Sequence, residues 1–347
     1  MRKQNISLKD TGRFSQLICD YLSKNKNLQD FYGNYPNLEN SQNQIKLKKD
    51  SYSKKSRKIL VNSLNAQYAK QFPKKEVSKN LELLANENTF TVTTGHQLCL
   101  MTGPLYFIYK IISTINLCKQ LKIKNPESDF IPVFWMASED HDFEEINSFL
   151  FQDNKIQWKT ESEGAVGDLP LTDLQKELDL FEAHLGNQSD VNFIKQLLKK
   201  SYRKAKNLSE ATFDLVNQLF GDYGLVIIEP NKKDLKNLFS PIVKDELTNN
   251  TSFYKVTEQI DLIKKKYNKK YSPQVNPREI NLFYLTSKGR FRIEKNDKGF
   301  SLIGGDLNFT KEAFFKTLKE YPERFSPNVI LRPLFQELIL PNLFFVG

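Results

Sequence analysis

Two short apolar segments, separated by one long helical pattern, constrain the fold of this chain more than any other feature. Residues 89–94 and 130–136 are rich in β-branched or aromatic residues and have the length of buried strands. Gly95 ends the first segment, and an apolar-periodic segment begins after Pro104. A strand, a helix and a strand of these lengths predict a βαβ crossover and a parallel sheet. Ligands bind outside the carboxyl ends of such strands, so both following loops are expected to share one edge.

The first two thirds of the 347-residue chain divide into a helical region and this α/β core. Residues 1–85 have a mainly helical pattern and are expected to form an N-terminal helical region. The core is predicted over 86–230, with an insertion at about 150–215. A third buried strand is predicted at 224–229, where an apolar run ends before a proline.

The last part of the chain is expected to leave the core and return to it. Residues 231–325 are predicted to form a connecting α+β insertion, with hairpin signals at 288–289 and 298–299. Residues 326–347 are expected to return to the core, with the last strand beginning near Asn328. The predicted fold class is therefore α/β, with a parallel-sheet core and inserted connecting segments.

Composition and charge exclude several classes of protein. Hydrophobic residues make up 39% of the chain and charged residues 27%, which is typical of a globular protein with a buried core. The formal net charge is +10, yet lysines are spread along the chain, arginine is scarce, and no nucleic-acid module is present. We expect a solvated lysine-rich surface with no nucleic-acid partner. Attraction to acidic small molecules remains open.

No apolar run reaches the roughly 20 residues of a membrane helix, and the first residues do not form a secretory signal. The chain has three cysteines, which is an odd number, and no Cys-x-x-Cys pair: Cys19, Cys99 and Cys118. Cys19 and Cys118 are expected to pack as small hydrophobic residues, and packing is also favoured over reactivity for Cys99. We expect a cytoplasmic protein without membrane association.

The loop after the first predicted strand could bind an anion. Gly95 and Gly103 allow the backbone to approach a ligand, and free N–H groups at the start of the next helix would favour phosphate or carboxylate. Lys110 lies one turn beyond Tyr106 and would direct a cation toward the same loop, although an ordinary surface lysine is an equal alternative. The pattern is neither a Walker A motif nor Gly-x-Gly-x-x-Gly. Two structural turns with a hydrogen-bonded His96 are an equally good interpretation.

Four ionisable residues directly follow the second predicted strand: Glu139, Asp140, His141 and Asp142. Carboxylates beside a histidine can hold Mg²⁺ or zinc, or can orient the imidazole as a general base. The alternative is a helix cap by Asp140 or Asp142. We favour a functional site, because capping needs only one such residue.

Other charged residues lie near predicted strand ends. Arg332, followed by Gln336 and Glu337, could clamp a carboxylate or phosphate, although a structural salt bridge is an equal alternative. Glu229 could contact a ribose hydroxyl, but a solvated loop residue is the favoured interpretation. His184 lies in a polar helical pattern and is expected to be a surface histidine.

A series of ordered motifs resembles the bacillithiol biosynthesis cysteine-adding enzymes. The motifs are Thr94-Gly95-His96-Gln97, Thr102-Gly103-Pro104-Leu105-Tyr106, Tyr109-Lys110, Pro132-Val133-Phe134-Trp135 with Glu139-Asp140-His141-Asp142, and residues 328–341. The resemblance extends over essentially the whole chain. It implies a Rossmann-like core interrupted by connecting insertions, together with a helical coiled-coil region used for dimerisation.

The resemblance implies a ligase that adds L-cysteine to glucosaminyl malate in the last step of bacillithiol biosynthesis. Such amide formation normally requires ATP to activate the cysteine carboxylate. The catalytic candidates are then Asp140, His141 and His96, and Asp140 with Asp142 could hold Mg²⁺. The residues expected to bind substrate or nucleotide are Thr94, Gly95, Gln97, Gly103, Tyr106, Lys110, Trp135, Glu139, Asp142, Arg332, Gln336 and Glu337.

Two other functions stay open: a metal-dependent hydrolase built on residues 139–142, and a non-catalytic binding protein. The family pattern continues beyond Gly347, so most of the coiled coil is expected to be missing from this chain. The full-length protein is expected to be a homodimer. Whether this fragment is active or completely folded stays open. Many family members carry glutamine at the position of His96, which leaves the role of that side chain open.

Overall fold

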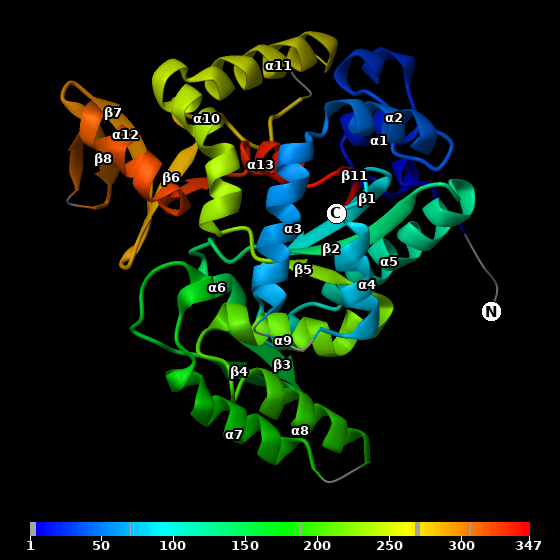
Figure 1. Ribbon diagram of the computed structural model, residues 1–347, viewed down its shortest axis with the longest axis vertical. Coiled ribbons are helices and arrows are strands. Elements are labelled where there is room, and N and C mark those ends of the chain that lie inside the picture. The colour runs from blue at the N-terminus through cyan, green and yellow to red at the C-terminus, as the bar shows by residue number, and fades with distance from the viewer. Residues whose placement is uncertain (1–4, 70, 72, 187–188, 268–270, 306) are drawn as a thin grey trace.

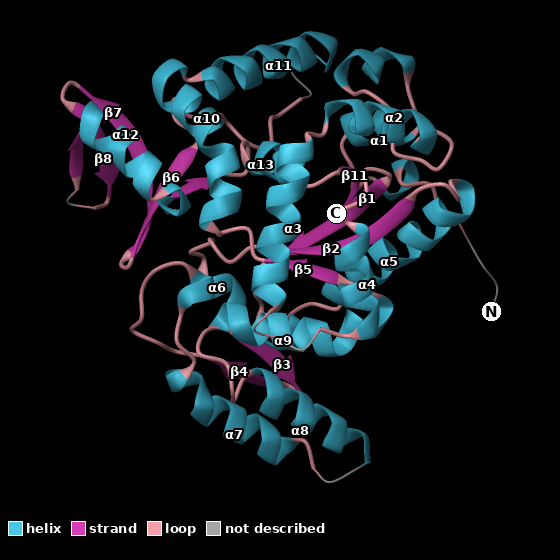
Figure 2. Cartoon of the chain, in the orientation of Figure 1, coloured by secondary structure: helices cyan, strands magenta, loops and turns pink. Residues whose placement is uncertain are grey.

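A four-stranded parallel sheet lies at the centre of the molecule (Figure 1). Its strands, in spatial order, are β11 (Asn342–Val346), β1 (Thr89–His96), β2 (Asp129–Met136) and β5 (Val226–Ile228). The structure, a computed structural model, describes residues 5–69, 71, 73–186, 189–267, 271–305 and 307–347. Helices surround the sheet (Figure 2), so its strands contribute mostly buried side chains.

The predicted crossover between the first two strands is confirmed. α5 (Tyr106–Lys124) connects them and packs on both. The strands pair in parallel from Thr89 opposite Asp129 to His96 opposite Met136. Almost every residue in them is buried, as expected for a parallel sheet covered on both faces. The predicted α/β fold with a Rossmann-like parallel sheet is therefore confirmed.

The strand order contains a topological switch point. Along the chain, β2 and β5 are added on one side of β1, whereas β11 is added on its other side. The order therefore reverses between β1 and β11. In open α/β sheets, ligands bind outside the carboxyl ends of the strands at such a reversal. The loop after β1 lies at this position.

Side chains from α3 (Lys54–Tyr68) cover the outer edge of β5. The N–H of Ile227 donates to the Tyr68 hydroxyl at 2.8 Å. The Gln67 amide donates to the Ile227 carbonyl at 2.8 Å and accepts from the N–H of Glu229 at 2.9 Å. These bonds satisfy main-chain groups that would otherwise pair with a further strand, so α3 closes this edge of the sheet.

The segment before β1 consists mainly of helices. In addition to α3, they include α1 (Gln16–Leu22), α2 (Ser41–Ser51) and α4 (Lys75–Leu83). Arg57 is buried and connects this region to the sheet, because its guanidinium donates to the carbonyls of Leu84 at 2.9 Å and Thr89 at 3.1 Å. The arginine therefore joins the end of α4 to the start of β1.

An insertion separates β2 from β5. It contains α6 (Phe143–Ile146), β3 (Ser148–Phe151), β4 (Asn154–Gln157), α7 (Gln175–His184), α8 (Ser189–Ser201) and α9 (Leu208–Phe220). Its backbone crosses the end of β2, where the N–H of Gly167 donates to the Ser138 carbonyl at 2.9 Å and the N–H of Val166 donates to the Asp140 carbonyl at 2.7 Å. A Cβ on Gly167 would lie 2.6 Å from the Ser138 Cβ, so this approach requires glycine.

A second insertion separates β5 from β11 and carries an antiparallel sheet of order β10-β6-β7-β8-β9. Its elements are α10 (Lys233–Asn249), α11 (Thr251–Tyr267), β6 (Leu282–Thr286), β7 (Gly289–Asn296), β8 (Gly299–Ile303), β9 (Asn308–Thr310), α12 (Lys311–Glu320) and β10 (Phe325–Pro327). The β6–β7 and β7–β8 hairpins turn at the predicted positions. Phe314 of α12 stacks on Phe300 with ring centroids 4.8 Å apart, which attaches the helix to the sheet.

The prediction that the last strand begins near Asn328 was wrong. The Asn328 side chain accepts hydrogen bonds from the N–H groups of Ile330 and Leu331, so it forms a turn before α13 (Arg332–Ile339). The short apolar run at 328–331 resembles a strand in sequence, but asparagine favours this local hydrogen bonding. The returning strand is β11, which follows α13.

Among the described residues, no helix has both the length and the hydrophobicity that a membrane crossing requires. The three cysteines are free thiols. Cys118 is buried in α5, in agreement with the predicted packing role, and Cys19 in α1 is partly exposed.

Replacing Tyr68 by phenylalanine should destabilise the protein. The substitution leaves the buried N–H of Ile227 without a hydrogen-bond acceptor, which typically costs about 1–3 kcal/mol. Urea unfolding followed by circular dichroism measures the change. Tyr254→Phe is the matched control, because Tyr254 is exposed. Equal stability of the two variants would show that Tyr68 does not support the sheet edge.

Candidate functional site

The loops after β1 and β2 meet at one edge of the sheet. The N–H of Ala137 donates to the His96 carbonyl at 3.2 Å, and the Gln97 amide lies 3.5 Å from a carboxylate oxygen of Asp140. His141 follows Asp140 directly, with its Nδ1 3.6 Å from Asp140 Oδ1. We call residues 95–103 and 140–142 together the rim. The two sets of residues singled out from sequence therefore belong to one polar region.

His96 is half-buried and has a defined tautomer. Its Nδ1 lies 3.0 Å from the Gln97 carbonyl, which can only accept a hydrogen bond, so Nδ1 carries the proton and Nε2 has a free lone pair. Burial lowers the pKa of His96, and the nearby Lys110 lowers it further. The imidazole is therefore neutral at pH 7. Its ring lies 5.3 Å from the ring of Tyr106, which is exposed.

Lys110 points back toward the loop after β1, as its position on α5 suggested. Its ammonium donates to the Gly95 carbonyl at 2.6 Å and lies 5.9 Å from the centre of the Tyr106 ring. Burial lowers the pKa of Lys110. An ammonium has three N–H donors, so two remain for a ligand. Lys110 thus places a positive charge at the switch point of the sheet.

Two N–H groups at the start of α5, where free donors were expected, are already hydrogen-bonded. The N–H of Phe107 donates to the Pro104 carbonyl at 2.9 Å, and the N–H of Ile108 donates to the Leu105 carbonyl at 3.1 Å. Tight turns at the helix start use these donors, as is common at helix ends. An anion at the rim would therefore not be bound by these two N–H groups.

The middle of the first loop adopts a strained backbone. Met101 and Thr102 have φ angles of 50° and 71°, in the left-handed region that residues with a side chain seldom occupy. Gly103 follows at φ 61°, and a Cβ there would lie 2.5 Å from the Cβ of Cys99. Burial raises the pKa of the Cys99 thiol to about 11, so Cys99 packs under the loop as an uncharged thiol. Strain of this kind is often found at functional sites.

Three consecutive residues after β2 bond to three later segments. The Ser138 hydroxyl donates to Glu229 at the end of β5. Glu139 forms an ion pair with Lys236 of α10. Asp140 accepts a hydrogen bond from Arg290 of β7. We call residues 138–140 the β2 exit. Both insertions therefore anchor on the segment that carries the predicted catalytic residues.

The ion pair between Glu139 and Lys236 is buried. The Lys236 side chain has no exposed surface, and its ammonium also donates to the Phe325 carbonyl at 2.9 Å. Burial lowers the pKa of Lys236, while the charge of Glu139 opposes that change. The short contact with a carboxylate keeps the lysine charged. Glu139 is thus bound to the second insertion and does not face solvent.

Asp140 is held by two arginines. Arg290 donates to one carboxylate oxygen at 3.1 Å, and Arg332 lies 3.9 Å from the other. The Arg290 guanidinium also donates to the Pro327 carbonyl at 2.8 Å and stacks 4.2 Å from the centre of the Phe283 ring. Burial lowers the pKa of Arg290, but a guanidinium remains charged in this range. Asp140 is therefore a fixed anion beside His141.

The rim does not fit the suggested metal site. Within the described residues, no group of three or more His, Cys, Asp or Glu side chains is arranged to hold a metal ion. The Asp140 carboxylate is already bound by Arg290 and Arg332, and Asp142 is exposed without capping α6. A carboxylate bound by arginines is a poor Mg²⁺ ligand. This arrangement does not favour the metal-dependent hydrolase.

Several residues singled out from sequence lie outside the rim. Trp135 is buried, and its ring packs against Phe335 at 5.5 Å. The Thr94 hydroxyl donates to the Val346 carbonyl at 2.8 Å, which joins β1 to β11. Glu337 forms an ion pair with Lys48 at 2.5 Å and so connects α13 to α2. Gln336 is buried in α13. These contacts are structural.

Sequence reasoning did not identify the three charged partners of the β2 exit. Glu229 was expected to be solvated, but only 8% of its surface is exposed, so that interpretation was wrong. Lys236 and Arg290 were not singled out, because one lies in a lysine-rich helix and the other in a polar hairpin. Only the long apolar run before Glu229 signalled its burial. The partners of Lys236 and Arg290 depend on the tertiary fold.

Residues 1–347, the whole chain, match the family model described as "Bacillithiol biosynthesis BshC, N-terminal Rossmann-like domain". The chain belongs to the BshC family. It is 47% identical over 342 residues to a relative from Flavobacterium johnsoniae and 48% identical over 343 residues to one from Flavobacterium psychrophilum. A relative from Christiangramia forsetii is 46% identical over 346 residues. All three are named "Putative cysteine ligase BshC".

Each of these alignments covers 99% of this chain and 64% of the relative. The chain therefore spans slightly less than two thirds of the length of the BshC relatives that it matches. The family model names a Rossmann-like domain, in agreement with the parallel sheet and its switch point.

Replacing Lys236 by methionine should strongly destabilise the fold. Removing one partner of a buried ion pair leaves an uncompensated charge, here Glu139, and typically costs about 3–5 kcal/mol. The double variant Glu139→Gln/Lys236→Met should recover part of this loss. Urea unfolding measures both variants, with Lys244→Met on the exposed face of α10 as control. A double variant as unstable as Lys236→Met would contradict the pairing.

The stability of the protein should depend on pH through Glu229. Burial raises the pKa of this carboxyl above its ordinary value of 4.5, so the folded state holds the proton more tightly than the unfolded state. The stabilising contribution of Glu229 is present below pH 4.5 and is lost as the pH rises through the folded-state pKa. Glu229→Gln should therefore gain stability over the unmodified chain as the pH rises. Urea unfolding across a pH series measures the difference, and a pH-independent difference would contradict the burial of an ionisable Glu229.

Proposed function

We propose that this chain is the Rossmann-like part of an ATP-dependent ligase that joins L-cysteine to glucosaminyl malate in the last step of bacillithiol biosynthesis. The family match over the whole chain supports this proposal, as do the names of its relatives. The observation that carries it is the contact between Gln97 and Asp140, because it brings the two family motifs together at the switch point. A ligase needs several polar groups at one such place.

The proposed reaction forms an amide bond between the cysteine carboxyl carbon and the amine nitrogen of the amino sugar. ATP would place a phosphoryl or adenylyl group on one carboxylate oxygen, with release of ADP or pyrophosphate. As the C–N bond forms, the C–O bond to that group breaks, and phosphate or AMP leaves. The amine loses a proton, and the neutral imidazole of His96 can accept it at Nε2. Asp140, fixed by Arg290, lies 3.6 Å from the Nδ1 of His141 at the same rim. Both histidines are therefore proposed to act on the attacking amine.

Cations at the rim suit the anionic partners of this reaction. Lys110 retains two N–H donors at the carboxyl end of β1. Arg332 is about one third exposed and reaches the rim from the start of α13. These two side chains would hold phosphate oxygens or a carboxylate and neutralise charge as it develops. These two cations support the proposal that ATP binds at the rim.

The compartment and assembly of the whole protein are part of the same proposal. The three free thiols suit a reducing cytoplasm, where ATP and free cysteine are both available. The resemblance to coiled-coil relatives suggests a homodimer for the whole protein, and the mass of the chimera described below would test this.

A chimera tests the proposed function. These 347 residues replace the matching part of the Flavobacterium johnsoniae relative, and the chimera is expressed in a bacillithiol-producing host whose own cysteine-adding gene is deleted. Mass spectrometry of derivatised thiols should show restored bacillithiol. His96→Asn and His141→Asn should each lower it by about 100-fold or more, because general acid–base groups contribute on that scale.

The chain offers a matched control, since His184 of α7 is exposed and lies outside the rim. His184→Asn should leave bacillithiol unchanged. A folded chimera that makes no bacillithiol, while the intact relative does, would overturn the proposed function in favour of a non-catalytic binding protein. Normal bacillithiol levels in both the His96→Asn and His141→Asn variants would reject the catalytic role of these histidines and would retain the proposed ligase function.

A further inference from the structure

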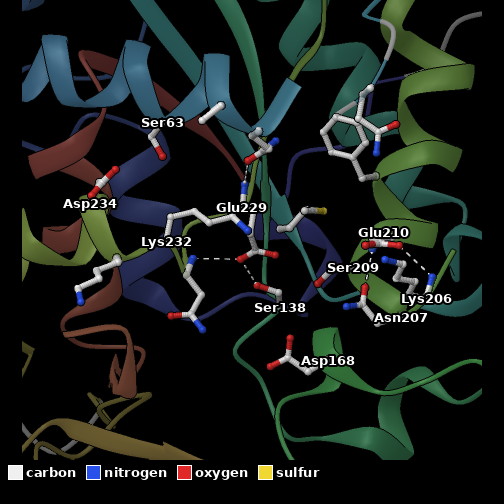
Figure 3. Close-up of a pocket in the computed structure, with 17 residues that line it drawn as sticks. Ser63, Ser138, Asp168, Lys206, Asn207, Ser209, Glu210, Glu229, Lys232 and Asp234 are labelled. Atoms are coloured by element: carbon white, nitrogen blue, oxygen red, sulfur yellow. Dashed lines mark hydrogen bonds between the residues drawn. The ribbon is translucent and has the colours of Figure 1, made fainter. Parts of the chain in front are cut away.

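A polar cavity lies at the β2 exit, next to Ser138. It has a volume of about 680 Å³ and opens at the ends of β2 and β5, between α3 and the starts of α9 and α10 (Figure 3). Ser138 and Glu229 form part of its wall, whereas His96 and His141 do not line it. We call it the Glu229 pocket. Its volume lies in the range of about 300–1,000 Å³ that small-molecule sites occupy.

Glu229 is the buried acidic group of this pocket. One carboxylate oxygen, Oε1, accepts hydrogen bonds from the Ser138 hydroxyl and from the N–H of Asn231 at 3.0 Å. The other oxygen, Oε2, has no hydrogen-bond donor within the described part of the chain. Burial also raises the pKa of Glu229. A buried carboxylate with an unused oxygen at a cavity wall is a receptor for a ligand ammonium.

Asn231 adds a second acceptor in the same wall. Its side-chain oxygen is buried and has no donor among the described residues. Buried polar atoms without a partner are rare in native proteins and often mark the position of a ligand or ordered water. Glu229 and Asn231, two residues apart, therefore both line the cavity, and each has a side-chain oxygen without a donor in the described part of the chain.

The opposite charge comes from lysines around the same cavity. Lys206, Lys232 and Lys233 line it, and none of them forms an ion pair within the described residues. Lys232 lies close enough to oppose the burial-induced rise in the pKa of both Glu229 and Asp168. It is also the N-cap residue of α10, whose first turn has no side-chain cap. A carboxylate at this position would meet a lysine and the positive end of a helix dipole.

The start of α9 cannot offer the same groups. The Asn207 side chain accepts from the N–H of Glu210, and the Glu210 carboxylate accepts from the N–H of Lys206 at 2.9 Å (Figure 3). This reciprocal capping occupies both the helix donors and the acid. The ligand-binding groups of the pocket are therefore Glu229, Asn231 and Lys232.

The geometry points to a binding site for a small molecule that carries a primary ammonium and a carboxylate. The ammonium binds Glu229 and Asn231, and the carboxylate binds Lys232 and the first turn of α10. The two substrates of the proposed ligase both have this chemistry, so the choice of ligands rests on that proposal. The volume suits the larger amino sugar better than a free amino acid. Ser138 then separates the bound amine from the rim by two residues.

Isothermal titration calorimetry of the 347-residue chain tests this site. The ligands are glucosaminyl malate and L-cysteine, with malate as a carboxylate that lacks the amine. At least one of the two amine-bearing ligands should bind, and malate should bind more weakly than that ligand. Glu229→Gln and Lys232→Gln should each weaken binding by about 10- to 100-fold, the loss expected for one charge-assisted hydrogen bond. Lys244→Gln, on the exposed face of the same helix, should bind as the unmodified chain does.

Circular dichroism establishes whether each variant is folded. If a substitution unfolds the 347-residue chain, the same substitution is made in the chimera and the titration is repeated there. Unchanged affinity in Glu229→Gln and Lys232→Gln, or no binding by either amine-bearing ligand, would overturn the site. The two proposals fail separately. If binding depends on Glu229 but the chimera makes no bacillithiol, the proposed binding site is retained and the proposed ligase function is rejected. If a Glu229→Gln chimera makes normal amounts of bacillithiol, the proposed binding site is rejected and the proposed ligase function is retained.

Discussion

The β2 exit is the constraint on which the rest of this structure depends. Ser138, Glu139 and Asp140 are consecutive, and each side chain bonds to a different later segment. Their partners are Glu229, Lys236 and Arg290. The backbone of the same residues also accepts hydrogen bonds from the first insertion at Val166 and Gly167. One short segment therefore sets the position of both insertions relative to the parallel sheet.

These contacts specify geometry more than they add stability. Taking Glu139 and Lys236 out of water has a large free-energy cost, which their attraction approximately offsets. An arrangement in which either insertion shifted would leave a buried charge without its partner, and that is much less favourable. The network around Asp140 acts in the same way, because Arg290 is almost fully buried. The β2 exit is consequently held in one conformation, as a preorganised site requires.

The β2 exit also contacts both polar regions of the molecule. Asp140 faces the rim, where His96 and Lys110 lie at the switch point, whereas Ser138 faces the Glu229 pocket. A reaction that joins two molecules gains most of its rate from holding them close together in a fixed orientation. Two receptors next to one rigid segment would provide that arrangement. The strained loop at Met101 and Thr102 belongs to the rim.

The local sequence was sufficient to predict β1, α5, β2 and the meeting of the two loops, because strand length, helical periodicity and the crossover rule are properties of neighbouring residues. It misplaced the last strand at Asn328, because an asparagine-capped turn and a strand start share the same short apolar pattern. The local sequence could not predict which charged residues pair with one another. Lys236 and Arg290 resemble ordinary surface residues in sequence, and only the apolar run before Glu229 indicated that Glu229 is buried. Only the tertiary structure decided their roles, because burial of a charge, and the distant partner that makes burial tolerable, exist only after the insertions have folded against the sheet.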